Sequence, residues 1–474
     1  MKILMVCAEL APWAKTGGLA DAVAGLSDAL GAAGHDVRVL LPAYPHIEPP
    51  RGNRHVLEAL GRRFVVTELE AERTAEHSGR RRARPRVLLL DLEDLTGDAI
   101  YMNDARDAGR FLRLSAAAAA LSGAGGWQPD VVHCHDWHTA LVPVFQRLMP
   151  SSRAPCVLTL HNVGYQGVFA DDVLALHGFG ALEPAFPADA RSGGATNFLR
   201  AGVRLADRVT TVSPTYAEEI RRPELGMGLE DALRARGSAL IGILNGVDYG
   251  VWSPELDPFL PEHYGPNDLL PKRRIKQALL DRLALPLGLD EPLIGVVSRL
   301  AVQKGIDLLA AALPALLEDT TAGFVFLGNG DAGLAAELRG LAALHPARLK
   351  FTEAFDEALS HWIFAGSDLT VVPSRYEPCG LTQLYALRYG TIPVVRATGG
   401  LADTIEHFDP ATGAGNGSVF LDADPQGVAW GVRTALGWFA NPAAWRQLVR
   451  NAMAADFSWP RQAPHYEELY RSLL

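Results

Sequence analysis

The hexapeptide Thr-Gly-Gly-Leu-Ala-Asp occurs twice in the chain, at residues 16–21 and again at residues 398–403. Each copy follows a short apolar run and precedes an amphipathic stretch, which predicts a strand, a glycine turn and the start of a helix. Glycines let the backbone approach a ligand closely, and the first N–H groups of a helix attract negative charge. The two copies therefore predict two nucleotide-binding domains that face one phosphorylated ligand.

Three basic residues near such turns can bind a diphosphate. Lys15 immediately precedes the first glycine turn and is charged at neutral pH, because the pKa of a lysine is about 10.4. Arg299 ends an apolar run and Lys304 stands five residues later, so a planar guanidinium and a compact ammonium can hold a departing diphosphate. The alternatives are a solvated loop for Lys15 and, for the other two, an exposed turn that pairs with acidic neighbours such as Asp307.

Glu377 stands within residues 373–383, between an apolar strand pattern and a helical pattern. A carboxylate just ahead of a helix N-terminus is favoured there, and it can accept hydrogen bonds from hydroxyl groups. The backbone amides of residues 380–382 are expected to be free to bind phosphate. The alternative is that Glu377 only caps the helix.

Polar and aromatic residues cluster near two strand ends in the first half of the chain: His133, His135, Asp136, Trp137, His138 and His161. Zinc needs three or four convergent ligands, and this spacing supports such a site only weakly. His, Asp and Trp side chains also recognise sugars, with the indole ring stacking on a pyranose. His161 alone is equally compatible with a buried core histidine.

Residues 328–333 match the pattern G-x-G-x-x-G after a predicted strand, and Glu353 lies 23 residues beyond Gly330. This offset is near that of the ribose-binding acid in dinucleotide-binding domains. An NAD-dependent oxidoreductase is therefore an alternative function. It leaves Arg299 and Lys304 unexplained, and a plain tight turn fits the glycines equally well.

Apolar runs alternate with helical patterns along the whole chain. This alternation is typical of doubly wound α/β sheets, in which ligands bind at the carboxyl ends of the strands. Periodicity fades over residues 245–271, which marks a break between two halves. Helices are predicted at 305–317 and 381–388, and strands at 2–8, 36–41, 86–91, 130–135, 155–161, 208–213, 241–244, 293–298, 323–328, 349–352, 368–373, 391–396 and 418–421.

The composition is that of an ordinary globular enzyme: 474 residues, 48% apolar and 21% charged, with a formal charge of −10. The negative charge argues against nucleic-acid binding, and residues 80–86, which are rich in arginine, are predicted to form a solvated loop. The four cysteines lack CxxC spacing, and we find neither a signal-peptide pattern nor an apolar run of membrane-spanning length. We expect a cytoplasmic protein without nucleic-acid or membrane partners.

In order and spacing, seven motifs resemble those of the bacterial glycogen synthase and plant starch synthase family, over essentially the whole chain. They lie at residues 15–21, 135–138, 161–167, 245–248, 298–305, 373–383 and 398–403. The resemblance implies a GT-B fold, in which two Rossmann-like doubly wound α/β domains face each other across a deep cleft. It implies an acceptor-side domain at 1–245, a nucleotide-sugar domain at 246–456, and a terminal helix at 457–474 that crosses back to the first domain.

The same resemblance implies an activity. The family transfers glucose from ADP-glucose to the non-reducing end of an α-1,4-glucan, such as glycogen or a maltooligosaccharide, and retains the anomeric configuration. It uses no cofactor and no metal, which argues against a zinc site around His133 to His138.

Roles are implied position by position. Lys15 and Gly18 resemble donor contacts, Asp21 resembles a polar support beside them, and Arg299 and Lys304 match the clamp on the diphosphate. The remaining matches are Glu377, Cys379 and Gly380 around the transferred glucose, Leu381 and Thr382 as amide contacts to phosphate, His161 and Asn245 on the opposite wall, and Asp136 and Trp137 on a sugar-facing loop.

Two positions depart from related patterns. Phe355 stands where relatives often carry a tyrosine against the base, so stacking is retained and any role of the hydroxyl is lost. Tyr385 stands eight residues after Glu377, where many GT-B enzymes have a second glutamate, which favours the glycogen and starch synthase branch. A catalytically silent glucan-binding relative is a third possible function, and the choice between ADP and UDP stays open.

Overall fold

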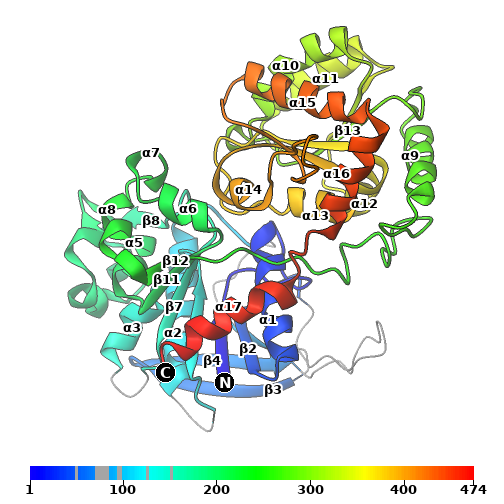
Figure 1. The fold of residues 1–474 in the computed structure, drawn as a ribbon. Coiled ribbons are helices and arrows are strands. Elements are labelled where there is room, and N and C mark those ends of the chain that lie inside the picture. Colours follow the sequence, from blue (N-terminus) through cyan, green and yellow to red (C-terminus); the bar gives the residue numbers. More distant parts are fainter. Residues whose placement is uncertain (48–51, 70–84, 93–98, 124–126, 150–152) are drawn as a thin grey trace. The chain divides into compact units, whose positions relative to one another are not determined.

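A computed structural model of the chain describes residues 1–47, 52–69, 85–92, 99–123, 127–149 and 153–474 (Figure 1). The chain forms two compact units, and the first contains both ends of the chain. Unit 1 comprises Met1–Gly246 and Trp459–Leu474, and unit 2 comprises Val247–Ser458. Each unit is a Rossmann-like α/β structure with its own sheet and its own hydrophobic core.

Unit 1 is built on a nine-stranded sheet with the order β12-β11-β7-β6-β1-β2-β5-β4-β3. Seven strands are parallel, and their apolar runs are buried because helices cover both faces. These strands are β1 (Lys2–Val6), β2 (Asp36–Pro42), β5 (Arg86–Leu90), β6 (Val131–His135), β7 (Cys156–Leu160), β11 (Arg208–Thr211) and β12 (Leu240–Gly242). The order reverses between β1 and β6, which makes their carboxyl ends the expected ligand position.

The principal helices of unit 1 are α1 (Gly18–Ala32), α2 (Ala105–Gly123), α3 (Val142–Leu148), α5 (Phe198–Leu205), α6 (Pro214–Glu219), α8 (Glu230–Ala235) and α17 (Trp459–Arg471). The last of these, α17, packs along α1 although the two lie at opposite ends of the chain (Figure 1). Its side chains Trp459, Tyr466 and Tyr470 are buried in the same core as β1 and β2. The final residues of the chain are thus an integral part of unit 1.

Unit 2 contains a six-stranded parallel sheet with the order β15-β14-β13-β16-β17-β18. Its strands are β13 (Leu293–Val297), β14 (Gly323–Leu327), β15 (Leu349–Thr352), β16 (Leu369–Val372), β17 (Ile392–Arg396) and β18 (Ser418–Phe420). Its helices are α9 (Leu270–Arg282), α10 (Ile306–Asp319), α11 (Ala332–Leu344), α12 (Glu357–Gly366), α13 (Thr382–Arg388), α14 (Gly399–Thr404), α15 (Pro425–Phe439) and α16 (Pro442–Ala454). Numbered within the unit, the strand order is 3-2-1-4-5-6, that of a dinucleotide-binding domain, and it reverses between β13 and β16.

Every strand predicted from the sequence is present, with ends that differ by at most two residues, and the helices predicted at 305–317 and 381–388 correspond to α10 and α13. The antiparallel strands were not predicted. They are β3 (Gly52–Ala59) and β4 (Arg62–Leu69) at the sheet edge, and the small sheet of β8 (Val168–Ala170), β10 (Ala195–Asn197) and β9 (Arg191–Ser192). Most side chains of β3 are exposed, so no apolar run marks it.

Two further expectations concern the surface. The arginine-rich loop predicted at residues 80–86 lies largely outside the described residues; Arg86 itself is in β5 and pairs with Glu68 at 3.1 Å. Among the helices that the structure describes, none combines the length and apolar character needed to cross a membrane.

Candidate active site

The predicted site residues of unit 2 lie where the strand order reverses. Adjacent parallel strands β13 and β16 end at the same edge of the sheet. The loop after β13 carries Arg299 and Lys304, and the loop after β16 carries Glu377. The topology therefore brings together residues that are more than 70 positions apart in the sequence.

A short ion pair joins these two loops. Lys304 Nζ lies 2.6 Å from Glu377 Oε2, and the hydroxyl of Ser374 donates to the same oxygen at 2.9 Å. The side chain of Glu377 is only 6% exposed and that of Lys304 20% exposed. Two donors on one oxygen fix the carboxylate and leave Oε1 as its other acceptor. Glu377 accepts no N–H of α13 in these contacts, so the helix-cap alternative is not supported.

A second ion pair holds the backbone of both loops. Arg375 binds Asp307 through two hydrogen bonds of 2.7 Å, and its N–H donates to the carbonyl of Gln303 at 2.8 Å. The alternative in which Asp307 neutralises Arg299 or Lys304 is therefore wrong. Arg299 is exposed, and the part of the chain that the structure describes records no carboxylate against it.

The second glycine turn packs directly against the Glu377 loop. Gly400 N–H donates to the carbonyl of Glu377 at 3.0 Å. Gly399 has a φ of +45°, and a Cβ built there would lie 1.9 Å from the same carbonyl oxygen. Only glycine permits this approach, so the turn supports the backbone that carries Glu377.

The other predicted residues of unit 2 occupy two places. Cys379 and Gly380 follow Glu377 and are tied by their carbonyls to the Gln383 side chain at 3.0 and 2.9 Å, and Leu381 and Thr382 start α13. Phe355 lies apart from them, in the loop between β15 and α12, and is 73% exposed. An exposed ring of this kind is available for stacking.

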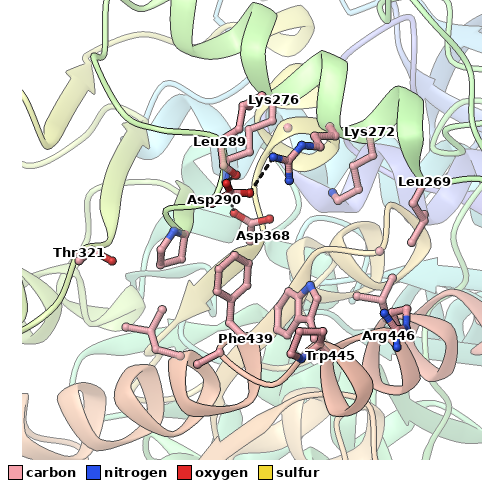
Figure 2. Close-up of a pocket in the computed structure, with 18 of the residues that line it drawn as sticks. Leu269, Lys272, Lys276, Leu289, Asp290, Thr321, Asp368, Phe439, Trp445 and Arg446 are labelled. Atoms are coloured by element: carbon pink, nitrogen blue, oxygen red, sulfur yellow. Dashed lines mark hydrogen bonds and ion pairs between the residues drawn. The ribbon is translucent and has the colours of Figure 1, made fainter.

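A groove of about 830 Å³ lies elsewhere in unit 2 (Figure 2). It is lined by residues that precede β13 and β16, such as Pro292 and Asp368, and so lies at the amino edge of the sheet. Ion pairs line it, among them Lys276 with Asp368 at 2.7 Å and Arg273 with Asp290 at 2.7 Å. Ligands of such sheets bind at the carboxyl edge, so this groove is not the candidate active site.

In unit 1, the first glycine turn follows β1. Lys15 pairs with Asp21 at 2.9 Å across the start of α1, which begins at Gly18. The buried side chain of Glu9, which the sequence did not single out, accepts the backbone N–H groups of Thr16 and Gly17 at 2.7 and 3.1 Å. Those two amides precede α1, so they are not among the helix-start amides, from Gly18 onward, that are expected to attract a phosphate.

Asp136 joins the ends of β6 and β7. It adopts a φ of +57°, unusual for a residue with a side chain, and accepts the backbone N–H of His161 at 2.7 Å. Burial raises the pKa of Asp136 to about 7, and the hydrogen bonds from His161 and Asn162 oppose that rise. Asp136 therefore holds the loop that carries His161.

The histidines of unit 1 contact each other and their surroundings. His133 binds Tyr470 and Thr159 at 2.7 and 2.6 Å, and His135 Nδ1 lies 3.0 Å from His161 Nε2. Burial lowers the pKa of His133, His138 and His161 to about 3, so these rings are neutral at pH 7. Within the described residues, no three His, Cys, Asp or Glu side chains are grouped to hold a metal.

Trp137 is a core residue. The residue is 9% exposed, and its ring lies at centroid distances of 5.1, 5.7 and 6.5 Å from Phe111, Phe169 and Phe198. The expectation that its faces stack on a sugar is therefore corrected. Asn245, three residues after β12, is also buried.

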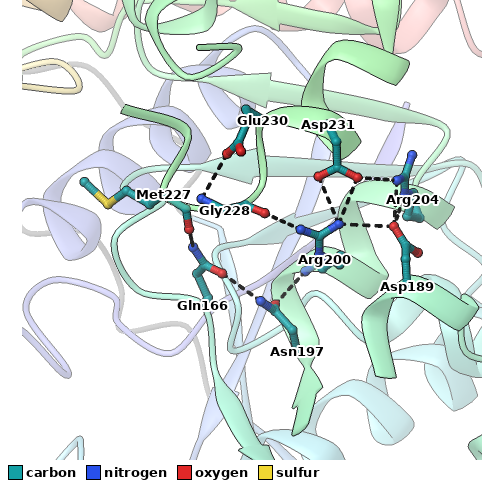
Figure 3. Close-up of polar contacts among 9 residues, drawn as sticks. All are labelled: Gln166, Asp189, Asn197, Arg200, Arg204, Met227, Gly228, Glu230 and Asp231. Atoms are coloured by element: carbon teal, nitrogen blue, oxygen red, sulfur yellow. Dashed lines mark hydrogen bonds and ion pairs between the residues drawn. The ribbon is translucent and has the colours of Figure 1, made fainter. Parts of the chain in front are cut away.

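A polar network fixes the loop that follows His161 (Figure 3). Gln166 donates to the carbonyl of Met227 at 2.8 Å and accepts from Asn197 at 2.7 Å, while Asn197 caps α5. Behind it, Arg200 binds Asp231 at 3.0 Å. The loop of residues 161–167 is thus anchored at both ends, by Asp136 and by Gln166.

The G-x-G-x-x-G sequence has a packing role. A Cβ at Gly330 would lie 2.3 Å from the carbonyl oxygen of Leu300, and Leu300 N–H donates to Asn329 at 2.7 Å. Glu353 forms an ion pair with Arg339. These glycines support the loop of Arg299, and the acid expected to bind a ribose is already paired, so the NAD alternative loses its basis.

Two family descriptions match the chain. Residues 2–235 match the starch synthase catalytic domain, and residues 281–446 match the glycosyl transferases group 1. The chain is 43% identical over 486 residues to the glycogen synthase of Anaeromyxobacter dehalogenans and 42% identical over 487 residues to that of Roseobacter denitrificans. In both cases the alignment covers all of both proteins.

Solved structures give a consistent picture. The catalytic domain of starch synthase IV from Arabidopsis thaliana, bound to ADP and acarbose, superposes with a TM-score of 0.87 at 34% identity and covers 99% of each chain. Sucrose-phosphate synthase from Thermosynechococcus elongatus superposes with a TM-score of 0.64 at 22% identity, covering 100% of this chain and 98% of that one. The second likeness concerns the fold alone.

Proposed function

Because the chain belongs to the glycogen and starch synthase family and is a GT-B glycosyltransferase of glycogen or starch synthesis, we propose that its donor is ADP-glucose. The acceptor is the non-reducing end of an α-1,4-glucan, either glycogen or a maltooligosaccharide, and the anomeric configuration is retained. The starch synthase IV structure, which holds ADP and acarbose, supports a nucleotide and a sugar chain as ligands of this fold.

The observation that carries the proposal is the Lys304–Glu377 pair beside exposed Arg299, at the carboxyl ends of β13 and β16. Departure of ADP from glucose leaves a new negative charge on the diphosphate. An arginine fork and an ammonium stabilise such a charge, and each donor of this kind contributes about 10²- to 10³-fold in rate. Lys304 has three N–H donors, so it can bind phosphate while it still holds Glu377.

Glu377 orients the transferred glucose in this proposal. Its Oε2 is taken by Lys304 and Ser374, so Oε1 accepts a hydrogen bond from a glucose hydroxyl. The C1–O bond to ADP breaks with oxocarbenium-like charge at C1, and O4 of the acceptor attacks C1 from the same face. The leaving phosphate oxygen takes the proton of the acceptor O4 hydroxyl. No carboxylate is assigned as a nucleophile, in contrast to retaining glycosidases.

The remaining predicted residues keep supporting roles. Cys379, Gly380, Leu381 and Thr382 line the glucose and the phosphate, and Phe355 stacks on the adenine. In unit 1, Lys15 contributes positive charge with Asp21 as its partner, and Asn245 binds glucose hydroxyls. His161 acts as a neutral hydrogen-bonding group, because burial keeps its pKa at about 3.

The proposed compartment is the cytoplasm. All four cysteines are free and buried, and Cys134 and Cys156 remain thiols although their sulfurs are 3.7 Å apart. Unpaired thiols at this distance fit a reducing environment.

The test compares ADP-glucose with UDP-glucose as donors to glycogen, with release of ADP or UDP followed over time. We expect turnover with ADP-glucose to exceed that with UDP-glucose by at least tenfold. The NMR coupling of the new anomeric proton should show the α configuration. Equal rates with both donors would contradict the donor assignment, and a β-linked product would contradict retention.

A further inference from the structure

The first glycine turn is organised by a buried carboxylate. Glu9, three residues after β1, is 3% exposed. Its Oε2 accepts the N–H groups of Thr16 and Gly17 at 2.7 and 3.1 Å, and its Oε1 accepts the hydroxyls of Thr16 and Tyr101 at 2.9 and 2.5 Å. Each oxygen thus receives two donors, and three of the four come from the turn itself.

All four donors are neutral groups. A buried carboxylate without a cation is costly unless its hydrogen bonds are satisfied, so this arrangement persists only as a complete set. Burial and the nearby charge of Glu9 raise the pKa of Tyr101, which keeps its hydroxyl protonated as a donor. The loop is also closed at its base, because Leu10 and Ala14 exchange backbone hydrogen bonds of 2.9 and 2.8 Å.

The position of Lys15 follows from these contacts. It lies between Ala14, which is bonded to Leu10, and Thr16, which is bonded to Glu9 through both its amide and its hydroxyl. Its ammonium then meets Asp21 on the first turn of α1 at 2.9 Å. The backbone on both sides of Lys15 is therefore held by contacts within the chain.

We propose that Glu9 is a positioning residue for glucosyl transfer, which acts by holding the Thr16–Gly17 turn and Tyr101 so that Lys15 is kept in place. The inference rests on the role proposed for Lys15. It assigns to Glu9 no contact with the substrate.

The test is the full-length Glu9→Gln variant, which preserves the shape of the side chain and replaces one acceptor oxygen with an NH2 group. On the Oε2 side that group would face two backbone N–H donors, so it occupies the Oε1 side, where the hydroxyls of Thr16 and Tyr101 must turn round and accept. All four hydrogen bonds then lose the negative charge of the acceptor. We expect kcat/KM for ADP-glucose to fall by about 10- to 100-fold, on the scale of hydrogen bonds to a charged group. In a Lys15→Ala background the same change should lower kcat/KM by less than about threefold, because the effects of residues that act as a unit do not add.

Asp257→Asn is the matched control. Asp257 is a buried carboxylate of unit 2 that accepts the hydroxyl of Tyr389 and the N–H of Phe259 at 2.9 Å, and its Oδ2 lies 2.7 Å from His361 Nδ1. It lies outside the proposed site, so its loss should lower the urea midpoint and leave kcat/KM within about threefold. If Glu9→Gln does not fold, Tyr101→Phe removes a single donor, and we expect a two- to fivefold loss of kcat/KM.

Several results would overturn the inference. The first is that Glu9→Gln folds and keeps the wild-type kcat/KM. The second is that Glu9→Gln lowers kcat/KM in the Lys15→Ala background as much as it does in the wild type. The third, if Glu9→Gln does not fold, is that Tyr101→Phe leaves kcat/KM unchanged. An unmodified chain that transfers glucose only from another donor would instead contradict the proposed donor. The variants are then compared on that donor, so the two failures are distinguishable.

Discussion

The two copies of the hexapeptide have the same sequence and opposite structural roles. In unit 1, the turn is held by a side chain, the carboxylate of Glu9, and leads into α1 of fifteen residues. In unit 2, the turn meets the backbone of Glu377 and leads into α14 of only six residues. Glu9 holds the first turn in place, whereas the second turn holds Glu377 in place.

The matched glycines express the same difference. Gly17 has an extended backbone and nothing within 4 Å of a Cβ placed on it, whereas a Cβ on Gly399 would collide with the carbonyl of Glu377. A repeated motif therefore identifies a repeated strand, turn and helix, but not a repeated chemistry. What each copy does depends on the residue that packs against it.

The largest expected effect comes from the residue that the second turn supports. Glu377→Ala should lower kcat by about 10³-fold, and Lys304→Ala by at least tenfold, because one orients the sugar and the other stabilises the leaving group. Steady-state rates with ADP-glucose and glycogen measure both. Near-normal turnover in folded Glu377→Ala would show that this residue is not part of the site. It would also contradict the role of the second turn as the support of a catalytic residue.

Replacing each of the two matched glycines, Gly17 and Gly399, with alanine tests the comparison directly. Gly399→Ala should lower kcat by about 100-fold, because the methyl group displaces the backbone of Glu377, and small misplacements cost this much. Gly17→Ala should keep kcat within about threefold, since its extended backbone suits any residue. Rates and urea midpoints are measured for both. The comparison fails if the two variants lose equal activity.

The two units should respond to pH in different ranges. The pKa of His133, His138 and His161 is about 3 in folded unit 1 and near 6.5 when unfolded, so the unfolded chain binds more protons between these values. Asp136, whose pKa is raised to about 7, binds its extra proton in the folded state and opposes this effect, but it is one group against three. The free energy of unfolding of unit 1 therefore falls as pH is lowered below about 6.5. In unit 2, burial lowers the pKa of Lys272 to about 7, which makes that unit more stable as pH rises from 7 towards 10.5.

Hydrogen exchange checks this difference between pH 7 and pH 5. Amides of β6 and β7 should lose protection, after correction for the intrinsic rate, while those of β13 and β16 change little. Equal losses in both sheets would show that the buried histidines do not set the acid sensitivity of unit 1.

The smallest expected effect concerns the exposed ring of unit 2. Phe355→Tyr should change KM for ADP-glucose by less than about twofold, because stacking is retained. Phe355→Ala should raise KM between about twofold and tenfold, on the scale of an aromatic contact of about 0.5–1.5 kcal/mol. A larger effect of the tyrosine than of the alanine would mean that the hydroxyl position, not the ring, matters.

The sequence predicted the parallel sheets because buried strands are continuous apolar runs. It did not predict β3 and β4, whose side chains are largely exposed or alternate. Arg299, Lys304 and Glu377 were predicted through residue type and position after strands. The contact between Lys304 and Glu377 was not predicted, because it depends on β13 and β16 being neighbours in the sheet.

Two errors have a common cause. Trp137 was assigned to a sugar because tryptophan can stack on a pyranose, but the ring is enclosed by Phe111, Phe169 and Phe198. Glu9 gives no signal in the sequence, because a single acidic residue after a strand forms no motif. In both cases burial determines the role, and burial of one side chain depends on residues that are distant in the sequence.

The helix α17 has a consequence for biosynthesis. Tyr466 and Tyr470 belong to the core that contains β1 and α1, and the hydroxyl of Tyr470 lies 2.7 Å from His133. As the nascent polypeptide leaves the ribosome, all of Val247–Ser458 emerges before these tyrosines do. The half of the enzyme that is translated first is thus the half whose core is completed last, which reverses the usual order of cotranslational folding.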